Sequence, residues 1–183
     1  FNSSKTNRQW RNIEIKVTMK GLITVKAFMA IGTLDFLLKL PSMHPNKFYF
    51  MTNKGKGLAY YEDGSKNIFS SGRGFEVIVK TGEIQEEGYV VMNNIPVLDE
   101  SVPVFEDRFK HGPNEVENMP GFQAFRLLRP LKGNTYVVLT QWQSVSDYEY
   151  WRDTPTFQKA HEKYKVKKSA YYAERPFTTT YHM

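Results

Sequence analysis

The segment from Trp151 to His161 holds the side chains of this chain that are best suited to chemistry, an indole followed by an imidazole. Thr154 and Pro155 are typical of the start of a helix. Beyond them, one face repeats at helical spacing: Phe157, Ala160, His161 and Tyr164. A buried imidazole must be neutral, hydrogen-bonded or bound to something, because an unpaired buried charge is costly. The pattern therefore predicts either a pocket where His161 ligates a metal or planar cofactor, or a core histidine bonded to a backbone carbonyl.

The composition limits the classes of protein that the chain can represent. Its 183 residues are 40% hydrophobic and 24% charged, which is ordinary for a globular protein. The absence of cysteine excludes disulfides, thiolate metal sites and cysteine nucleophiles, and it fits a reducing cytoplasm, where we expect the protein. The longest apolar candidate, residues 21–40, is interrupted by Lys26, Gly32 and Asp35. We therefore expect no membrane partner.

The net charge of +6 is unevenly distributed. Residues 1–18 contribute +3 of it and have no clear periodicity, so they are expected to be a polar tail or an upstream or tag-derived segment, with Met19 as a plausible start. The remaining +3 serves either solubility or attraction of an anionic ligand. Two further parts are expected, an N-terminal half at 19–86 and a C-terminal domain at 87–183.

The N-terminal half is expected to be a small α+β unit. Its strands are predicted at residues 22–31, 47–52 and 58–61. Thr33 is a suitable cap for a helix over Leu34–Leu40, which Pro41 would end. Residues 53–57 have the composition of a turn. The apolar segment 67–80 leaves strand and helix open.

The C-terminal half has a clearer pattern. Strands are predicted at residues 89–97, 122–128, 135–142 and 177–181. Between them, Ser101 caps a helix with an apolar face formed by Val102, Phe105 and Phe109. Ser146 and Glu149 have capping-box spacing for a second helix that runs through Trp151. The order is βαββαβ, the ferredoxin-like plan, which hosts many activities.

Several motifs in this order resemble one family. They are Val91–Val97, Phe105–Lys110, Val116–Phe122, Arg126–Pro130 and Trp151–His161, with a weaker match at Gly32–Leu37. Together they are similar to the IsdG-type heme-degrading monooxygenases of the antibiotic-biosynthesis-monooxygenase (ABM) superfamily, and most to the longer, HmoB-like bacillus-type members. The resemblance implies a dimeric α+β barrel fold in which the N-terminal half replaces a second subunit, giving a pseudo-dimeric monomer.

The resemblance also implies roles for individual residues. His161 is the implied axial ligand of heme iron, Trp151 the wedge that distorts the macrocycle, and Asn93 the distal hydrogen-bond donor. Asn94 is a rival to Asn93, because adjacent strand residues point to opposite faces. Arg108 matches an arginine near the heme propionates, and an exposed helix salt bridge is its alternative. No role is expected for the other histidines, His44, His111 and His182.

The implied activity is oxidative opening of heme, which is both substrate and cofactor, using O2 and an unidentified external electron donor, with release of iron. The alternatives are a non-enzymatic heme-binding protein and a signal-transduction protein of the TRAP type, which shares the two-part architecture. No nucleic-acid partner is expected. Arg73–Phe75 begins like an RNA-recognition motif, but Glu76 and Val77 do not continue it.

Overall fold

The computed structural model of the chain describes residues 24–63, 66–111, 115–158, 161 and 172–183. Its strands are β1 (Lys26–Gly32), β2 (Tyr49–Asn53), β3 (Lys56–Asp63), β4 (Arg73–Gly82), β5 (Tyr89–Pro96), β6 (Phe122–Pro130), β7 (Thr135–Trp142) and β8 (Phe177–His182). Its helices are α2 (Leu34–Leu37), α3 (Leu40–Met43), α4 (Val102–His111) and α5 (Val145–Arg152), with 3-10 turns at Asp99–Ser101 and Glu115–Asn118. A further helical turn covers residues 155–158.

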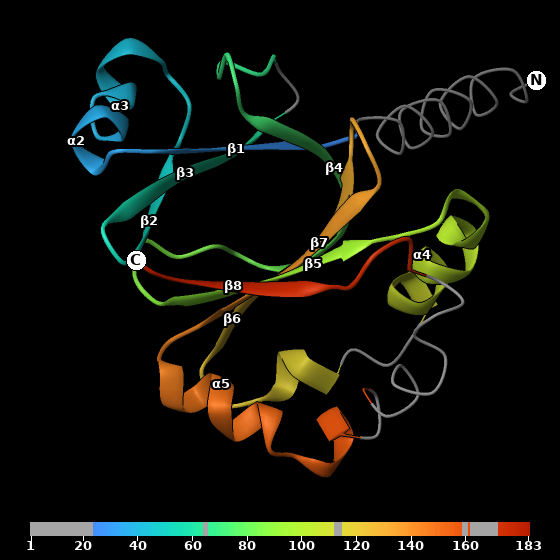
Figure 1. The fold of residues 1–183 in the computed structure, drawn as a ribbon. Coiled ribbons are helices and arrows are strands. Elements are labelled where there is room, and N and C mark those ends of the chain that lie inside the picture. The colour runs from blue at the N-terminus through green and yellow to red at the C-terminus, as the bar shows by residue number, and fades with distance from the viewer. Residues whose placement is uncertain (1–23, 64–65, 112–114, 159–160, 162–171) are drawn as a thin grey trace, which may run out of the picture.

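The strands close into one antiparallel barrel in the order β1-β3-β2-β8-β5-β7-β6-β4 (Figure 1). Strands β1 to β4 are adjacent as β4-β1-β3-β2, and β5 to β8 as β8-β5-β7-β6. Each set thus has its fourth strand beside its first, then its third, then its second, as a ferredoxin-like unit does. The two units pair edge to edge through β2–β8, at Thr52 and His182, and through β4–β6, which closes the described strands into one barrel. The predicted α+β barrel is confirmed.

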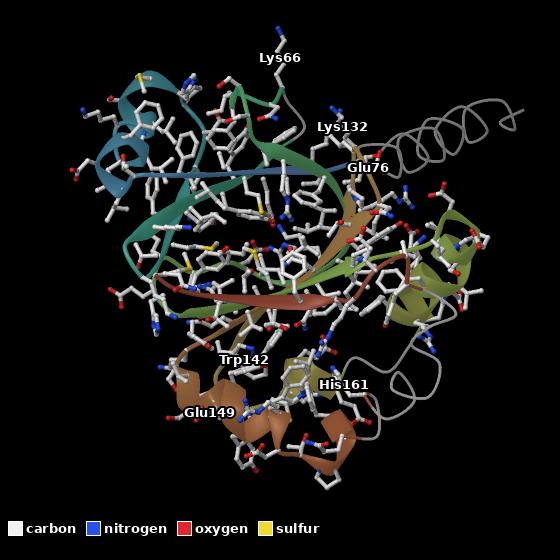
Figure 2. All side chains as sticks on the ribbon, viewed as in Figure 1. Lys66, Glu76, Lys132, Trp142, Glu149 and His161 are labelled. Atoms are coloured by element: carbon white, nitrogen blue, oxygen red, sulfur yellow. The ribbon has the colours of Figure 1, made fainter. Side chains whose placement is uncertain are left out.

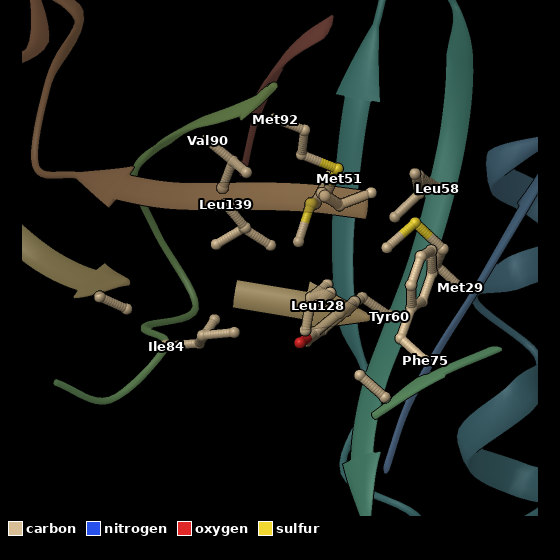
Figure 3. Close-up of a cluster of buried hydrophobic side chains, with 13 residues drawn as sticks. Met29, Met51, Leu58, Tyr60, Phe75, Ile84, Val90, Met92, Leu128 and Leu139 are labelled. Atoms are coloured by element: carbon tan, nitrogen blue, oxygen red, sulfur yellow. The ribbon is translucent and has the colours of Figure 1, made fainter. Parts of the chain in front are cut away.

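The barrel is filled by side chains that alternate inward along each strand. Val90 and Met92 of β5 and Val137 and Leu139 of β7 belong to this interior cluster. The other members shown in Figure 3 include Met29, Met51, Leu58, Tyr60, Phe75, Ile84 and Leu128. The interior is therefore packed.

Helices cover the outer face of each unit. In the C-terminal unit, Phe105 of α4 packs with Phe125, Leu127, Tyr136 and Val138 of β6 and β7. In the N-terminal unit, Leu37 and Leu40 pack on Phe28, Phe48, Ala59 and Tyr61. The described residues between β3 and β4, 66–72, contain no helix that would correspond to α5.

Two local expectations were wrong. Pro41 does not end a helix over 34–40, because α2 stops at Leu37 and Pro41 lies in the first turn of α3, where a missing N–H costs nothing. The cap of α5 is Ser144, whose Oγ accepts a hydrogen bond from the backbone N–H of Asp147, and not Ser146 with Glu149. The open segment 67–80 contributes to a strand, β4.

Candidate functional site

The strand register separates the two neighbouring asparagines. Asn94 is buried and points into the barrel, where its Oδ1 accepts hydrogen bonds from the Arg73 guanidinium at 3.3 and 3.4 Å. Asn93 pairs across the sheet with Val138, which belongs to the outer-face cluster under α4. Asn93 therefore lies on the helix-covered face of β5, and Asn94 does not.

A neighbouring strand fixes the Asn93 amide. Thr178 of β8 lies directly opposite Asn93, and its hydroxyl donates to Asn93 Oδ1 at 2.8 Å. This bond fixes the orientation of the amide, whose Nδ2 group is its donor to a ligand. The side chain is half-buried on the outer face of the sheet.

Trp151, near the end of α5, rests on a second indole. Its ring stacks on Trp142 of β7 with centroids 5.1 Å apart and planes inclined by 27°. Trp142 is fully buried, and its Nε1 donates to Thr140 Oγ1 at 3.0 Å. Phe157 packs edge-on against Trp151 at 4.7 Å. Trp142 and Phe157 therefore fix the Trp151 ring, Trp142 by stacking on its face and Phe157 by an edge contact.

His161 continues the same aromatic stack. Its ring lies parallel to Phe157, with centroids 3.7 Å apart, and is half-buried. Nδ1 lies 2.9 Å from the carbonyl oxygen of Phe157, so in the neutral ring Nδ1–H donates and Nε2 carries the lone pair. The backbone thereby orients the ring. Figure 2 shows Trp142 and His161 on the side of the barrel where α5 lies. Ala160 and Tyr164, expected on the same helix face, lie outside the described residues.

The three predicted site residues thus share one face of the molecule. Trp151 and His161 are joined through Phe157, while Asn93 lies farther along the sheet. Its partner Val138 is four residues from Trp142 on β7, about 13 Å at ~3.3 Å per residue. The sheet between them is a buried floor of small side chains, Val91, Val138 and Thr140.

Arg108 lies half-buried on α4, a different element from the other three residues. This helix is anchored through Glu106, which accepts hydrogen bonds from Arg129 Nε at 2.6 Å, Arg129 Nη2 at 2.7 Å, Tyr136 Oη at 2.6 Å and Lys110 Nζ at 3.0 Å. Burial favours the protonated form of Glu106, but the bonds from Arg129, Tyr136 and Lys110 outweigh it and lower its pKa to about 2. The carboxylate therefore stays ionised and fixes α4 on β6 and β7.

The start of α5 packs close to the sheet because residue 121 is a glycine. Gly121, just before β6, has φ +74°, and its carbonyl accepts the N–H of Gln143 at 2.7 Å. A Cβ there would collide with the Asp147 side chain in the first turn of α5. This explains a glycine in the segment Val116–Phe122 and lets the helix that carries Trp151 approach the barrel.

Two cavities open at other places. One of about 400 Å³ is lined by Glu76, Lys80, Lys110 and Arg129 among others, and one of about 550 Å³ by Tyr89, Ser144, His182 and Met183 among others. Neither is lined by Asn93, Trp151 or His161. The described residues also hold no cluster of three or more His, Asp or Glu side chains able to bind a metal ion. Within the described ranges, no helix is both long and apolar enough to cross a membrane.

Three contributors to the site were not identified from sequence: Thr178, Trp142 and the Phe157 carbonyl. Thr178 was predictable in principle, since the βαββαβ order places the last strand beside the first. Trp142 ends the strand predicted over 135–142, and only the position of α5 reveals what rests on it. The carbonyl acceptor depends on the side-chain conformation of His161.

The comparisons with known proteins agree with this architecture. Residues 88–163 match the profile of the family described as antibiotic biosynthesis monooxygenase, ABM. A heme-degrading monooxygenase of Listeria monocytogenes is 24% identical over 131 residues, 71% of this chain and 78% of that protein. The signal transduction protein TRAP of Staphylococcus aureus strain MRSA252 is 26% identical over 133 residues, 72% of this chain and 80% of that protein. A mycobilin-producing heme oxygenase of Mycobacterium tuberculosis is 43% identical over 67 residues, 36% of this chain and 64% of that protein.

Two solved structures share the fold. A major regulator of staphylococcal pathogenesis superposes with a TM-score of 0.76 at 23% identity, over 86% of this chain and 98% of the other. A heme-degrading enzyme from Listeria monocytogenes superposes with a TM-score of 0.67 at 20% identity, over 86% and 98%. Because an enzyme and a regulator have this same fold, the fold does not decide the function.

Proposed function

We propose that the protein is a heme-degrading monooxygenase, starting from the match of residues 88–163 to the ABM family model. It binds heme as substrate and cofactor, opens the porphyrin with O2 and electrons from an external donor, and releases the iron. One arrangement supports the proposal. The His161 imidazole, the Trp151 indole stacked on Trp142 and the Asn93 amide bound by Thr178 lie on one outer face of the sheet.

The donor chemistry of these residues fits heme. A single neutral imidazole with one nitrogen held by a backbone carbonyl is a good axial ligand, because the acceptor orients the ring and raises the basicity of the other nitrogen. A porphyrin brings its own four nitrogen ligands, so no cluster of protein ligands is required. Val91 and Val138 on the intervening sheet are apolar, as contacts to a macrocycle require, but both are buried in this structure, so heme reaches them only if the residues that cover this face move aside. Heme supplies the iron that activates O2 and the ring carbon that is oxidised.

Each residue then has a defined task. His161 holds the iron through Nε2. Trp151 presses on the macrocycle from a fixed position, since Trp142 beneath it is buried and cannot give way. Asn93 would donate from Nδ2 to a ligand on the iron, and the Thr178 hydroxyl, which donates to its Oδ1, would hold the amide in that orientation. Arg108 pairs with a propionate, for which a guanidinium is well shaped.

The enzymatic assay is direct. Purified protein is mixed with hemin, then with ascorbate in air, with catalase present to remove free peroxide. A Soret band that forms and then bleaches, with iron captured by a ferrous chelator, supports the proposal. A Soret band that persists under reductant leaves heme binding without turnover.

A signal-transduction role is the second candidate. It is favoured by the TRAP relative, which covers as much of this chain as the Listeria enzyme does. The close packing of Trp151 on Trp142 and of Phe157 on His161 also favours it, since these rings already cover one another. Absence of any Soret band with hemin would reject the enzyme and leave this role as the remaining candidate.

We also propose that the protein works as a monomer. One chain supplies all the strands of the closed barrel, with β2–β8 and β4–β6 making the contacts that two subunits would otherwise share. Sedimentation velocity should give the mass of one chain, 21.4 kDa. A stable dimer would contradict this part of the proposal.

A further inference from the structure

The Phe157 ring contacts both of the aromatic side chains that would act on heme. It makes an edge contact with Trp151, with ring centroids 4.7 Å apart and planes inclined by 79°. It also stacks on His161, with centroids 3.7 Å apart and planes inclined by 19°. One side chain therefore connects the indole that would press on the macrocycle to the imidazole that would hold the iron.

The backbone connects the same two residues through Thr154. Its hydroxyl donates to the carbonyl oxygen of Trp151 at 2.7 Å and accepts the backbone N–H of Phe157 at 3.3 Å. The carbonyl oxygen of Phe157 in turn lies 2.9 Å from His161 Nδ1. Hydrogen bonds and ring contacts thus both pass through Phe157, and together they hold Trp151 and His161 at one separation.

This position of Phe157 is compatible with iron binding by His161. The Nε2 lone pair of an imidazole lies in the plane of its ring, whereas Phe157 covers the face of the ring. The side chain of Phe157 is half-buried, as are those of Trp151 and His161. Phe157 has no group that could exchange a proton or bind iron, so its effect on a reaction must come through the residues that it contacts.

The separation of Trp151 from His161 decides where a bound macrocycle is bent. Iron held by Nε2 fixes the centre of the porphyrin, and the indole then presses at an offset from that centre. A different offset brings a different ring carbon into the position where it is oxidised. Because a misplacement of about 1 Å can change a rate by about 100-fold, a small shift of the indole is enough to alter the choice of carbon.

We propose that Phe157 is a positioning residue that selects the ring carbon at which heme is opened, by fixing Trp151 relative to His161. The proposal rests on the proposed function. Leucine at this position separates the two contributions of Phe157, because it keeps the backbone carbonyl that orients His161 but loses both ring contacts.

The isomers of the ring-opened product provide the first test. Hemin and ascorbate are supplied as in the enzymatic assay, and the products are separated by liquid chromatography. Phe157→Leu should change the isomer ratio by about threefold or more, while the Soret maximum keeps its position and hemin affinity stays within about threefold. Phe157→Tyr keeps the ring and should retain the wild-type ratio. A merely structural role would lower stability or affinity without changing the ratio.

The matched control is Phe50→Leu. Phe50 is also a half-buried phenylalanine in a stacked pair, with Phe48, but it belongs to the N-terminal unit. Its replacement should leave the isomer ratio unchanged. Thermal unfolding of all three variants shows that each is folded.

A measurement without heme tests the contact itself. The ring current of Phe157 moves the NMR signals of protons above its face upfield, so the carbon-bound ring protons of His161 should move downfield in Phe157→Leu. They should stay in place in Phe157→Tyr. The spectrum of His161→Ala identifies these signals among those of the four histidines.

Two results would overturn the proposal while the proposed function stands. An active Phe157→Leu variant opens heme with the wild-type isomer ratio, or its His161 signals do not move. Failure of the proposed function looks different, since the wild type then binds no heme or leaves it intact. In that case this role of Phe157 is rejected with it, even if the NMR spectra confirm the stacked rings.

Discussion

Replacing Glu106 by glutamine should be among the most damaging single changes that leave the shape of a side chain intact. The carboxylate is 5% exposed and accepts four hydrogen bonds, from Arg129, Tyr136 and Lys110. Glutamine keeps one acceptor oxygen but turns an amide NH2 toward the guanidinium, where two donors then meet. Glu106 is buried but Arg129 is 38% exposed, so removing the charge should cost roughly 3 kcal/mol of unfolding free energy, the low end of what is typical of a buried charged pair.

The pKa of Glu106 gives a second estimate of the same quantity. It is lowered from 4.5 to about 2, and each pKa unit corresponds to about 1.4 kcal/mol, so ionised Glu106 contributes roughly 3 kcal/mol. Because the pKa is depressed in the folded state, this contribution is present above about pH 4.5 and is lost as the pH falls toward 2. The difference in stability between wild type and Glu106→Gln should therefore shrink over the same range.

Urea unfolding followed by tryptophan fluorescence at several pH values measures this difference. At pH 7 we expect a loss of roughly 3 kcal/mol with an unchanged m-value, and a melting temperature lower by about 6–12 °C for a chain of this length. Asp107→Asn is the matched control. Its carboxylate is 70% exposed and pairs only with exposed His111 among the described contacts, so its loss should be about 0.5 kcal/mol or less. A Glu106→Gln loss below about 1 kcal/mol, or a difference that persists unchanged in acid, would refute the reasoning.

Two further predictions concern the site and its support. Thr178→Val removes the hydroxyl that orients the Asn93 amide, so it should slow the bleaching of bound heme by ascorbate while leaving hemin affinity within about threefold. Thr178→Ser keeps the hydroxyl and should behave as the wild type does. Equal bleaching rates for the valine and serine variants would contradict this role of Thr178. Gly121→Ala and Gly133→Ala both place a side chain at positive φ, +74° and +81°, but only the former collides with Asp147, while the latter meets open space. Gly133→Ala should therefore cost about 1 kcal/mol and Gly121→Ala at least twice that in urea unfolding, and similar losses would argue against close packing at Gly121.

Most strands were predictable because their apolar residues alternate or cluster between turn residues. The strand expected over 135–142 has the bounds of β7. The choice between Asn93 and Asn94 was not predictable in this way, since both faces of β5 are covered and its apolar residues show no alternation. The long-range pairing with β7 and β8 decides which asparagine faces the helices.

The capping residue of α5 was predicted wrongly for a similar reason, because a long-range contact decides it. Ser146 and Glu149 have suitable spacing, but the backbone N–H of Gln143 donates to the carbonyl of Gly121, so the helix begins two residues earlier and Ser144 is the cap. Pro41 is compatible with both the end and the start of a helix, and sequence alone did not choose. Closure of the barrel came from the family resemblance, because edge pairing between distant strands has no local signal.

The central claim is that His161 holds heme iron, and a hemin titration of the His161→Ala variant tests it most directly. The wild type should give a Soret band typical of an imidazole-ligated heme, and His161→Ala should lose or shift this band and regain it when imidazole is added. His111→Ala, which changes an exposed histidine on α4, should titrate as the wild type does. A His161→Ala spectrum identical to that of the wild type would contradict the account.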